Sequence, residues 1–483
     1  MNPRPGIQVR TAAAVGSQQA ARRRRDVLLF FVAQAMPLVV LCGCVGTAIP
    51  AERAARSELT GIKDRYRPDH AKPALPALTA ASGLADYLRF GMFNSPRVEA
   101  AYHEWAASVE QITTARSRPD PRLTFKADIA SMVMSVMAGL MVDLPGPEKL
   151  RVAGEIAAAT SQARYYVFEM EVLRAAFAVK RVYYRLQFLE DNLRLQREML
   201  TLLGDLEERA RQQNAVGRAT LQDVLRAQIE REQLKNRIEN LEDSRGTLQA
   251  ELKASLGLGA GEADPPVPAT FTSSGEPLDH EGILESASRH NPRIQRMAAD
   301  VRRAQSLLDL AHKAGVPDFS VGIEVDFKAN PAMWTPSASV TLPVWRDKIA
   351  AGIAGAQAET RAATARLSQE EVELAAELAA LLYLYRESTR DMELLEARLL
   401  PKGRQALEAA RAGYANDKSR FSDVIDSYRQ LLDFDLAFLE ARTRRELALA
   451  SLSLLIAGTP PPGSPLPNPA ERANPVPSKE VSP

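Results

Sequence analysis

The 483-residue chain carries the same pattern of sequence twice, and this duplication limits the folds open to it. At residues 210–225 and again at 410–428, a short polar break and an Asp-Val pair stand between two long runs with helical apolar periodicity. The acidic residues of the two pairs, Asp223 and Asp423, lie 200 positions apart. Two helical hairpins with similar tips would produce this pattern, so the sequence predicts a duplicated structural unit.

Each copy opens on a helix start that contains proline, Asn-Ser-Pro-Arg at 94–97 and Asn-Pro-Arg at 291–293. Proline is favoured in the first helical turn, where its missing N–H costs nothing. Each predicted helix runs to a second break, at 118–121 or 315–318, and strand-like sequence follows. Residues 319–327 alternate apolar with small or polar residues, and Leu-Pro at 144–145 and 342–343 ends the second strand of each copy. The sequence therefore predicts one β-hairpin per copy.

Two residue types in these hairpins leave alternatives open. Trp334 and Trp345 suit an aromatic belt at a membrane interface, or ordinary packing. Four methionines lie in the first hairpin, where thioether sulfur suits soft metals such as Cu(I) but also serves as adaptable apolar filler or a lipid-facing surface. These methionines are Met132, Met134, Met137 and Met141.

Very long helical patterns follow the hairpins, at about 147–213 and 346–412, with return helices at about 219–256 and 419–457. Some 65 residues of helix would span roughly 100 Å, and Pro401 is expected to kink the second long helix. In the first return helix the apolar seam has the spacing of a coiled coil. The seam consists of Leu234, Ile238, Leu241, Leu248 and Leu252.

The sequence thus predicts a mainly α fold with a small β part, built from two tandem repeats that each combine a β-hairpin with long coiled-coil helices. Six segments are expected. They are a lipoprotein signal peptide (1–44), an extended N-terminal arm (45–79), a first repeat (80–256, strands about 121–145, tip about 214–220), a linker (257–279), a second repeat (280–458, strands about 318–343, tip about 413–420) and a Pro-rich disordered tail (459–483).

The N-terminal segment has the features of an export signal. Four arginines at 22–25 precede an apolar stretch at 27–41 that is short for a membrane span. The stretch ends Leu-Cys-Gly-Cys at 41–44, which resembles a lipobox in which Cys44 becomes the acylated N-terminus. A plain secretory signal with two incidental cysteines is the alternative.

Composition argues against several function classes. Cys42 and Cys44 lie together near the N-terminus, so the body of the chain has no disulfide framework or cysteine-based metal site. The five histidines are scattered, and the net charge of +1 gives no case for a nucleic-acid surface. We also find no Gly-rich phosphate loop and no Ser/His/Asp arrangement. The sequence predicts neither an enzyme nor a bound cofactor.

Four strands per chain would require an oligomer if the hairpins enter a membrane. Strands of about nine to eleven residues can cross a bilayer when tilted, but an open sheet edge is untenable in lipid. Outer-membrane barrels begin at about eight strands, so two chains would supply 8 strands and three would supply 12. The alternative is a soluble sheet packed on the helices.

Over about residues 80–458 the chain resembles the TolC-like outer-membrane efflux proteins, in their lipoprotein-anchored branch. The resemblance rests on the Asn-Pro-Arg helix starts, the Leu-Pro strand ends, Leu-Leu-Pro at 399–401 and the two Asp-Val tips, in duplicate order. It implies a homotrimer with a 12-stranded barrel in the outer membrane and an α-helical tunnel in the periplasm. It also implies two partners, a periplasmic adaptor (membrane fusion) protein and an inner-membrane pump, whose substrates the channel would pass outward. Parts of the chain also resemble the heavy-metal-efflux subgroup.

The resemblance directs attention to the second tip. Asp423 and Asp426 match the family's carboxylates near the periplasmic end of the tunnel, and their spacing puts both on one helix face. In a trimer they would form carboxylate rings that filter passage electrostatically. Helix capping is the alternative role of Asp423, and Asp223 is expected to be its structural counterpart.

The tips themselves are candidates for adaptor docking, with solvated turns as the alternative. The second tip lacks the glycine of the first, and Asn416 is a candidate for the left-handed conformation in its place. The docking candidates are Val216, Gly217, Arg218, Asn416, Asp417 and Lys418.

The sequence is therefore consistent with two functions. The first is a passive exit duct of a tripartite efflux system. The second is a lipid-anchored periplasmic coiled-coil scaffold without channel activity.

Overall fold

The computed structural model describes residues 48–129, 133–268, 271, 283–329, 331–416, 418–456 and 460–467. Contacts divide the chain into two units, Met1–Pro50 and Ala51–Pro483, and the arrangement below is that of the second unit. The predicted signal peptide and Cys44 lie outside the described residues.

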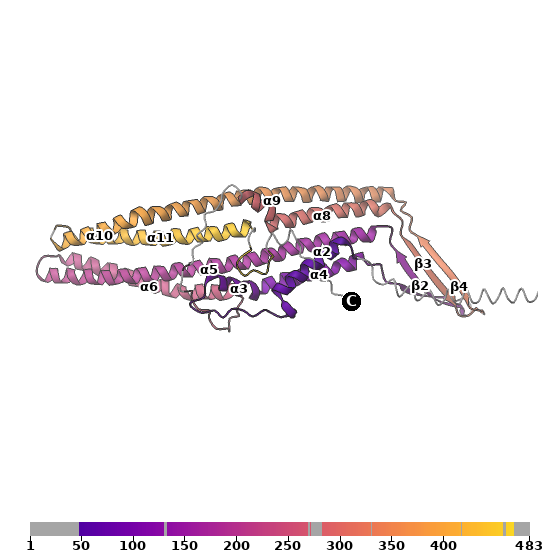
Figure 1. Ribbon diagram of the computed structural model, residues 1–483, viewed down its shortest axis with the longest axis horizontal. Helices are drawn as coiled ribbons and strands as arrows, with labels where there is room; N and C mark the ends of the chain where they lie inside the picture. Colours follow the sequence, from indigo (N-terminus) through magenta and orange to yellow (C-terminus); the bar gives the residue numbers. More distant parts are fainter. Residues whose placement is uncertain are drawn as a thin grey trace, which may run out of the picture. The chain divides into compact units, whose positions relative to one another are not determined.

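Helices dominate, in two matching sets (Figure 1). In each set, two shorter helices precede a β-hairpin, and a very long helix and a return helix follow it. The first set comprises α3 (Leu84–Asn94), α4 (Pro96–Arg116), β1 (Arg122–Ile129), β2 (Val133–Leu144), α5 (Lys149–Ala215) and α6 (Leu221–Ser255). The second comprises α7 (Ile283–His290), α8 (Pro292–His312), a 3₁₀ turn η2 (Lys313–Gly315), β3 (Phe319–Asp326), β4 (Met333–Val340), α9 (Arg346–Leu394), α10 (Leu400–Ala415) and α11 (Phe421–Ile456). The predicted fold class of two mainly helical repeats is confirmed.

The asparagine of each helix-start motif closes its own repeat. Asn94 Nδ2 donates to the carbonyl oxygen of Leu256 at 2.9 Å, at the end of α6. Asn291 Nδ2 donates to the carbonyl oxygen of Leu455 at 2.7 Å, near the end of α11. The last carbonyls of a helix have no partner within it, so one side chain satisfies such a group and ties the end of each repeat to its beginning.

The helices are held by two clusters of buried apolar side chains. Trp105 of α4 stacks on Phe168 of α5, with ring centroids 5.8 Å apart, and both side chains are fully buried. Along α6 the predicted seam is buried except at Leu241, which is half-buried. A second cluster joins α7, α9 and α11 around Leu378 and Leu452. Burial of such side chains supplies the main favourable free energy of folding.

Near Pro401, where the sequence predicts a kink, the helix contains a π-helical turn. The segment η3 (Leu395–Leu399) separates α9 from α10, and Pro401 lies in the first turn of α10. Proline cannot donate a backbone hydrogen bond to the preceding turn, and a π-turn is one way for a helix to accommodate that loss.

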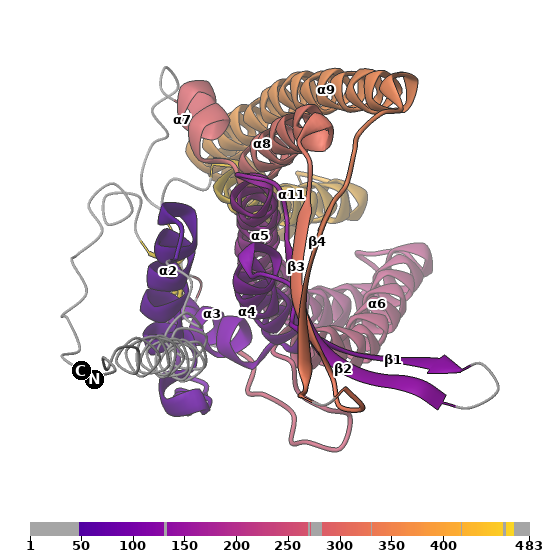
Figure 2. The ribbon, with the colours of Figure 1, turned by 90° about the vertical axis from the view of Figure 1, so that its right-hand side faces the viewer.

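The four strands form one antiparallel sheet in the order β1-β2-β3-β4. Within each hairpin β1 pairs with β2 and β3 with β4, while β2 and β3 join the two repeats, for example through Leu140 opposite Ile323. In Figure 1 the strands lie beyond the ends of α5 and α9, and Figure 2 views the same strands from that end. The described strands pack extensively only on one another, and no described helix packs extensively on the sheet.

The register separates the two faces of the sheet by chemistry. Paired residues share a face and successive residues alternate between faces. One face carries Leu123, Phe125, Leu140, Val321 and Trp334 with further Val, Ile, Ala and Pro residues, and we call it the apolar face. The other, the polar face, carries Arg122, Thr124, Lys126, Gly139, Asp143, Glu324, Asp326, Thr335, Ser337 and three methionines.

The apolar face is uncovered. Phe125 is 72 % exposed, Trp334 63 % and Val321 46 %. Such a row of exposed large apolar side chains marks a surface that another apolar phase contacts.

Two terminal segments differ from the sequence prediction. The arm at 45–79 is not simply extended, because Pro50–Tyr66 forms the helix α2. Pro50 is the first residue of this helix, and no proline follows within it. Its Glu52 is buried between Arg56, one turn later in α2, and Arg116 of α4. In the Pro-rich tail, residues 460–467 pack on the body, where Leu466 is 5 % exposed and joins the main core. The rest of the tail, from 468, lies outside the described residues.

Among the described residues, the structure contains no helix with both the length and the apolar character needed to traverse a bilayer.

The docking of α2 should depend on pH. Glu52 is 1 % exposed and accepts hydrogen bonds from Arg116, from Thr113 at 2.6 Å and from Arg56 at 3.3 Å. Arg116 chiefly, with Thr113 and Arg56, lowers the pKa of Glu52 from 4.5 to about 2. A lowered pKa stabilises the folded state above the ordinary pKa, and this contribution is lost as the pH falls toward the folded pKa. Full loss of this contribution lowers the free energy of unfolding by about 3 kcal/mol.

Hydrogen exchange of the α2 amides measures this effect. Protection should fall between about pH 5 and pH 2 in the natural protein, and Glu52→Gln should weaken protection at neutral pH and remove most of the pH dependence. Asp64→Asn, an exposed position on the same helix, serves as the control. Equal protection in the natural protein and Glu52→Gln at every pH would contradict the assignment.

Candidate functional site at the hairpin tips

The two hairpin tips have the same backbone hydrogen bonds. In the first, the N–H of Arg218 donates to the carbonyl oxygen of Gln213 at 2.8 Å. In the second, the N–H of Lys418 donates to the carbonyl oxygen of Gly413 at 2.8 Å, 200 positions later. In the first tip Gly217 adopts φ +77°, which a residue with a side chain rarely takes.

Asn416 does not replace that glycine, so this prediction was wrong. Its φ is −106°, and its side-chain nitrogen donates to the carbonyl oxygen of Ala412 at 2.8 Å, so it extends the end of α10. The position equivalent to Gly217 is 417, and Asp417 lies outside the described residues. Three of the remaining docking candidates are exposed: Val216, at 69 %, and Arg218 in the first tip, and Lys418 in the second.

Asp423 caps the start of α11. Its Oδ2 accepts the N–H of Arg420 at 3.0 Å. Asp223 makes the matching bond at the first tip, accepting the N–H of Thr220 at 3.1 Å. Both carboxylates therefore satisfy a backbone donor that the helix leaves unpaired, as in a capping box. The carboxylate of Asp423 is still exposed, so capping does not remove it from the surface.

Asp426 lies one turn further along α11 and is more freely placed. Its side chain is 71 % exposed, and the Arg429 guanidinium lies 3.8 Å from its carboxylate. The same guanidinium bonds Glu230 of α6, whose side chain is buried. Asp423 and Asp426 share the exposed face of α11, because Phe421, Val424, Ile425 and Tyr428 occupy its buried face.

Arg429 and Glu230 were not anticipated from the sequence. They connect the return helices of the two repeats near the tips, and they lie 199 residues apart. The one signal in the sequence is that Glu230 lies at helical spacing between the apolar residues Ala227 and Leu234. The structure shows all three on the buried side of α6. Burial of Glu230 needs a cation, and Arg429 supplies it.

A groove of about 360 Å³ lies between the two tips. It is lined by Arg209 and Arg218 from the first hairpin and by Arg411 and Tyr414 from the second, with Leu206 and Val216 as apolar walls. Glu408 lies 3.4 Å from Arg411. Three guanidinium groups on apolar walls make this groove suited to an acidic, amphipathic segment.

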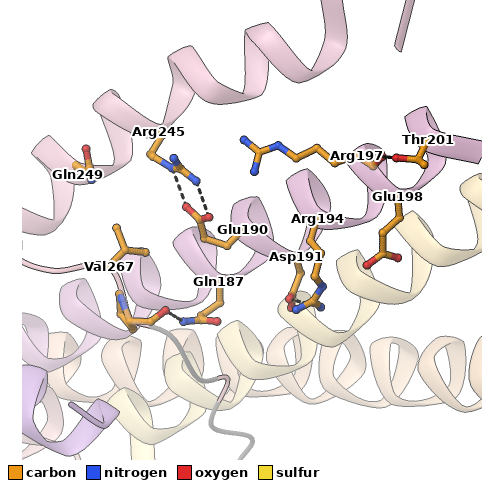
Figure 3. Close-up of a pocket in the computed structure, with 11 residues that line it drawn as sticks. Gln187, Glu190, Asp191, Arg194, Arg197, Glu198, Thr201, Arg245, Gln249 and Val267 are labelled. Atoms are coloured by element: carbon orange, nitrogen blue, oxygen red, sulfur yellow. Dashed lines mark hydrogen bonds and ion pairs between the residues drawn. The ribbon is translucent and has the colours of Figure 1, made fainter. Parts of the chain in front are cut away.

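A larger pocket of about 770 Å³ lies between α5, α6 and the linker (Figure 3). Its charged side chains pair with one another or with near neighbours. Arg245 makes a two-pronged ion pair with Glu190 at 2.6 and 2.8 Å, Arg194 bonds Asp191 at 2.7 Å, and Arg197 pairs with Glu242. The pairs of Arg245 and Arg197 join α5 to α6, the pair of Arg194 lies within α5, and none of these paired groups is a free reactive group.

Within the described part of the chain, no three His, Cys, Asp or Glu side chains converge as a metal site would require. The arrangement at the tips can attract cations and bind a partner, but it offers no nucleophile activated by a neighbouring base.

Comparison with known proteins agrees with this geometry. The profile of the family described as "Outer membrane efflux protein" matches residues 93–258 and 283–458, one match for each repeat. No curated protein sequence matches the chain. The fold is similar to that of several solved structures at low sequence identity.

The outer membrane protein VceC of Vibrio cholerae is 17 % identical with a TM-score of 0.66, covering 77 % of this chain and 95 % of that one. The CmeC outer membrane channel of Campylobacter jejuni is 13 % identical with a TM-score of 0.66, covering 82 % and 91 %. The open state of the MtrE outer membrane channel of Neisseria gonorrhoeae is 17 % identical with a TM-score of 0.64, covering 80 % and 94 %.

Removal of the cap should loosen the second tip. Asp423→Ala is expected to lower the local free energy of opening at the start of α11 by about 1 kcal/mol, measured as faster amide exchange over residues 421–425. Asp223→Ala should do the same at the first tip, and Asp426→Ala should leave exchange unchanged. If Asp426→Ala loosens the tip as much as Asp423→Ala does, the capping assignment is wrong.

Proposed function

Because the chain belongs to the outer membrane efflux protein family, whose members are channels and not enzymes, we propose that it is the exit duct of a tripartite efflux system. In this proposal a homotrimer passively conducts substrates that an inner-membrane pump and a periplasmic adaptor deliver. The sheet of each chain contributes to a shared 12-stranded barrel in the outer membrane, and the long helices form a tunnel in the periplasm.

The uncovered apolar face of the sheet carries this proposal. In a soluble scaffold protein that face would pack on helices, yet the described strands pack extensively only on one another. A lipid phase outside and water inside would match the apolar and polar faces respectively. The scaffold alternative leaves side chains such as Phe125 and Trp334 in water, which costs about 1.5–3 kcal/mol for each large apolar side chain.

Unpaired edges favour pooling of strands between chains. β1 and β4 each pair on one side only among the described strands, so two rows of backbone groups lack partners. Lipid offers these groups no hydrogen bonds, so the sheets of neighbouring chains must supply them.

The helix α6 also carries a row of exposed apolar side chains near the first tip, which a neighbouring chain would cover. In this row Leu221 is 64 %, Leu225 48 % and Ile229 55 % exposed.

A lipid anchor at Cys44 is compatible with the position of α2. Six residue steps separate Cys44 from Pro50, which allows at most roughly 20 Å of extended chain. Glu52 bonds Arg116, the last residue of α4, and β1 begins soon afterwards at Arg122. The start of α2 therefore lies near the junction with the sheet, where an outer-membrane surface would be within reach of acyl chains.

For the tips we propose two roles. Asp423 and Asp426 form rings of exposed carboxylates at the periplasmic end, which concentrate cations there. The basic groove between the tips, together with Val216, Gly217, Arg218, Asn416, Asp417 and Lys418, receives the adaptor through a segment with acidic residues.

Membrane extraction separates the duct from the scaffold. A chain exported with an ordinary cleavable signal in place of residues 1–44 carries no acyl anchor. It should nevertheless stay in the outer-membrane fraction through salt and alkaline washes and require detergent, because the apolar face of the sheet holds it. Release of this chain into the soluble periplasmic fraction would contradict the duct.

Planar-bilayer recordings test the carboxylate rings. Asp423→Asn, which keeps an oxygen for the cap, and Asp426→Asn should each lower the cation-to-anion permeability ratio, by an amount on the order of severalfold. Asp223→Asn is the matched control and should leave the ratio unchanged. An unaltered reversal potential in the Asp423→Asn, Asp426→Asn double variant would remove both residues from the gate.

A further inference from the structure

The methionines of the sheet lie on its polar face. Met137 of β2 pairs with Asp326 of β3, and Asp326 pairs in turn with Met333 of β4. Neighbouring strands lie about 4.8 Å apart, so the two thioether side chains flank one carboxylate in a single row. Met141 lies four residues further along β2, opposite Gly322, on the same face. Met132, and the side chain of Met134, lie outside the described residues.

This placement is not that of apolar filler. Methionines that face lipid would alternate with the polar residues and lie among Leu, Val and Phe on the apolar face. The three methionines that the strand pairing places, Met137, Met141 and Met333, all lie on the polar face. On the polar face Met333 is 54 % exposed, so it fills no core.

Two of the described carboxylates on the polar face are paired, Asp143 with Arg122 opposite Met141 and Glu324 with Lys126, and Asp326 is the one beside Met137 and Met333. Lys126 lies in the same row as Met137, but its ammonium group is bound to Glu324 at 2.5 Å across β2. Gly139 makes room for this ion pair, since a Cβ there would lie 2.6 Å from Cγ of Glu324. Asp326, 8 % exposed, accepts the N–H of Lys328 at 2.9 Å and lies between the two methionines.

Sulfur and carboxylate together select a class of ligand. Thioether sulfur is a soft donor that favours Cu(I) and related ions over Na⁺, K⁺ or Mg²⁺. A carboxylate beside the sulfurs favours a cation over an uncharged apolar solute. We propose that Met137, Met141, Met333 and Asp326 form a binding path for soft monovalent cations, Cu(I) or Ag(I), on the polar face of the sheet.

This inference rests on the proposed duct, because only in a barrel does the polar face line a water-filled lumen. Three chains would then place nine thioethers around that lumen. Several weak, neighbouring sites let an ion enter and also leave, which conduction requires. The substrate class of the duct would accordingly include soft metal ions.

Silver nitrate in chloride-free buffer is the probe, applied to the full-length trimer in detergent and in planar bilayers. The test variant is Met137→Leu, Met141→Leu, Met333→Leu, because leucine keeps the volume and removes the sulfur. The control variant is Met199→Leu, Met297→Leu, Met392→Leu, which removes as many thioethers from the helices. The cysteines are the same in all three proteins.

The natural protein and the control variant should bind Ag⁺ in detergent, and micromolar Ag⁺ should reduce their K⁺ current. In the test variant the bound Ag⁺ should fall, and the concentration of Ag⁺ that halves the K⁺ current, relative to the current of the same protein without Ag⁺, should rise by about tenfold. Equal Ag⁺ binding by the test variant and the natural protein, or an equal loss in the control variant, would overturn the proposal. The absence of K⁺ current from every protein would overturn the duct, while the binding measurement in detergent would still decide the site.

Discussion

Backbone hydrogen bonding at the edges of the four-stranded sheet, together with its uncovered apolar face, constrains the whole molecule. A sheet with one apolar face is stable when that face meets another apolar phase. A sheet with two open edges is stable in lipid only when other strands complete the ladder. No described part of this chain meets either requirement, so in the proposed duct membrane insertion and assembly of chains would be one coupled step.

The duplication also determines how the helices of one chain are arranged. Each repeat places a hairpin before a very long helix and returns to its own start, where Asn94 or Asn291 binds the end of the return helix. The duplication therefore yields two similar helical repeats side by side, whose tips lie together around a basic groove. Ion pairs join the two repeats, for example Arg429 with Glu230 and Arg442 with Asp191.

The two tips are similar in backbone and different in charge. Asp223 and Asp423 cap their helices in the same way, so the capping acid is a property of the repeat. The position of Asp426 is occupied by Arg226 in the first copy. The charge of the two tips can therefore differ although their backbone hydrogen bonds are the same.

Local chemistry made much of this fold predictable. The order of elements follows from prolines at helix starts and Leu-Pro at strand ends, because these signals act within a few residues. The 200-residue repeat then shows that the same order occurs twice. The errors arose where contacts between residues far apart in the sequence determine the local structure. Residues 50–66 were expected to be extended because prolines surround them, whereas Glu52 finds Arg116 64 positions away. The tail seemed too rich in proline to pack, yet Leu466 reaches the core.

Side-chain placement in the sheet was the least predictable feature. Alternation in a single strand is a weak signal, and the chemistry of each face emerged only with the register that joins β2 to β3. The same holds for Arg429 and Glu230, which no spacing rule connects. Asn416 was misjudged because a left-handed residue was expected one position before the site of Gly217 in the repeat.

Fluorescence of Trp334 in vesicles tests whether the apolar face of the sheet contacts lipid. The chain has three tryptophans, of which Trp105 is buried in the helical core and Trp345 lies beyond the end of β4. Lipids brominated deep in their acyl chains should quench part of the emission of the reconstituted protein, and Trp334→Phe should abolish that part whereas Trp345→Phe should retain it. Trp334 emission that is insensitive to brominated lipid but quenched by aqueous iodide would contradict the account.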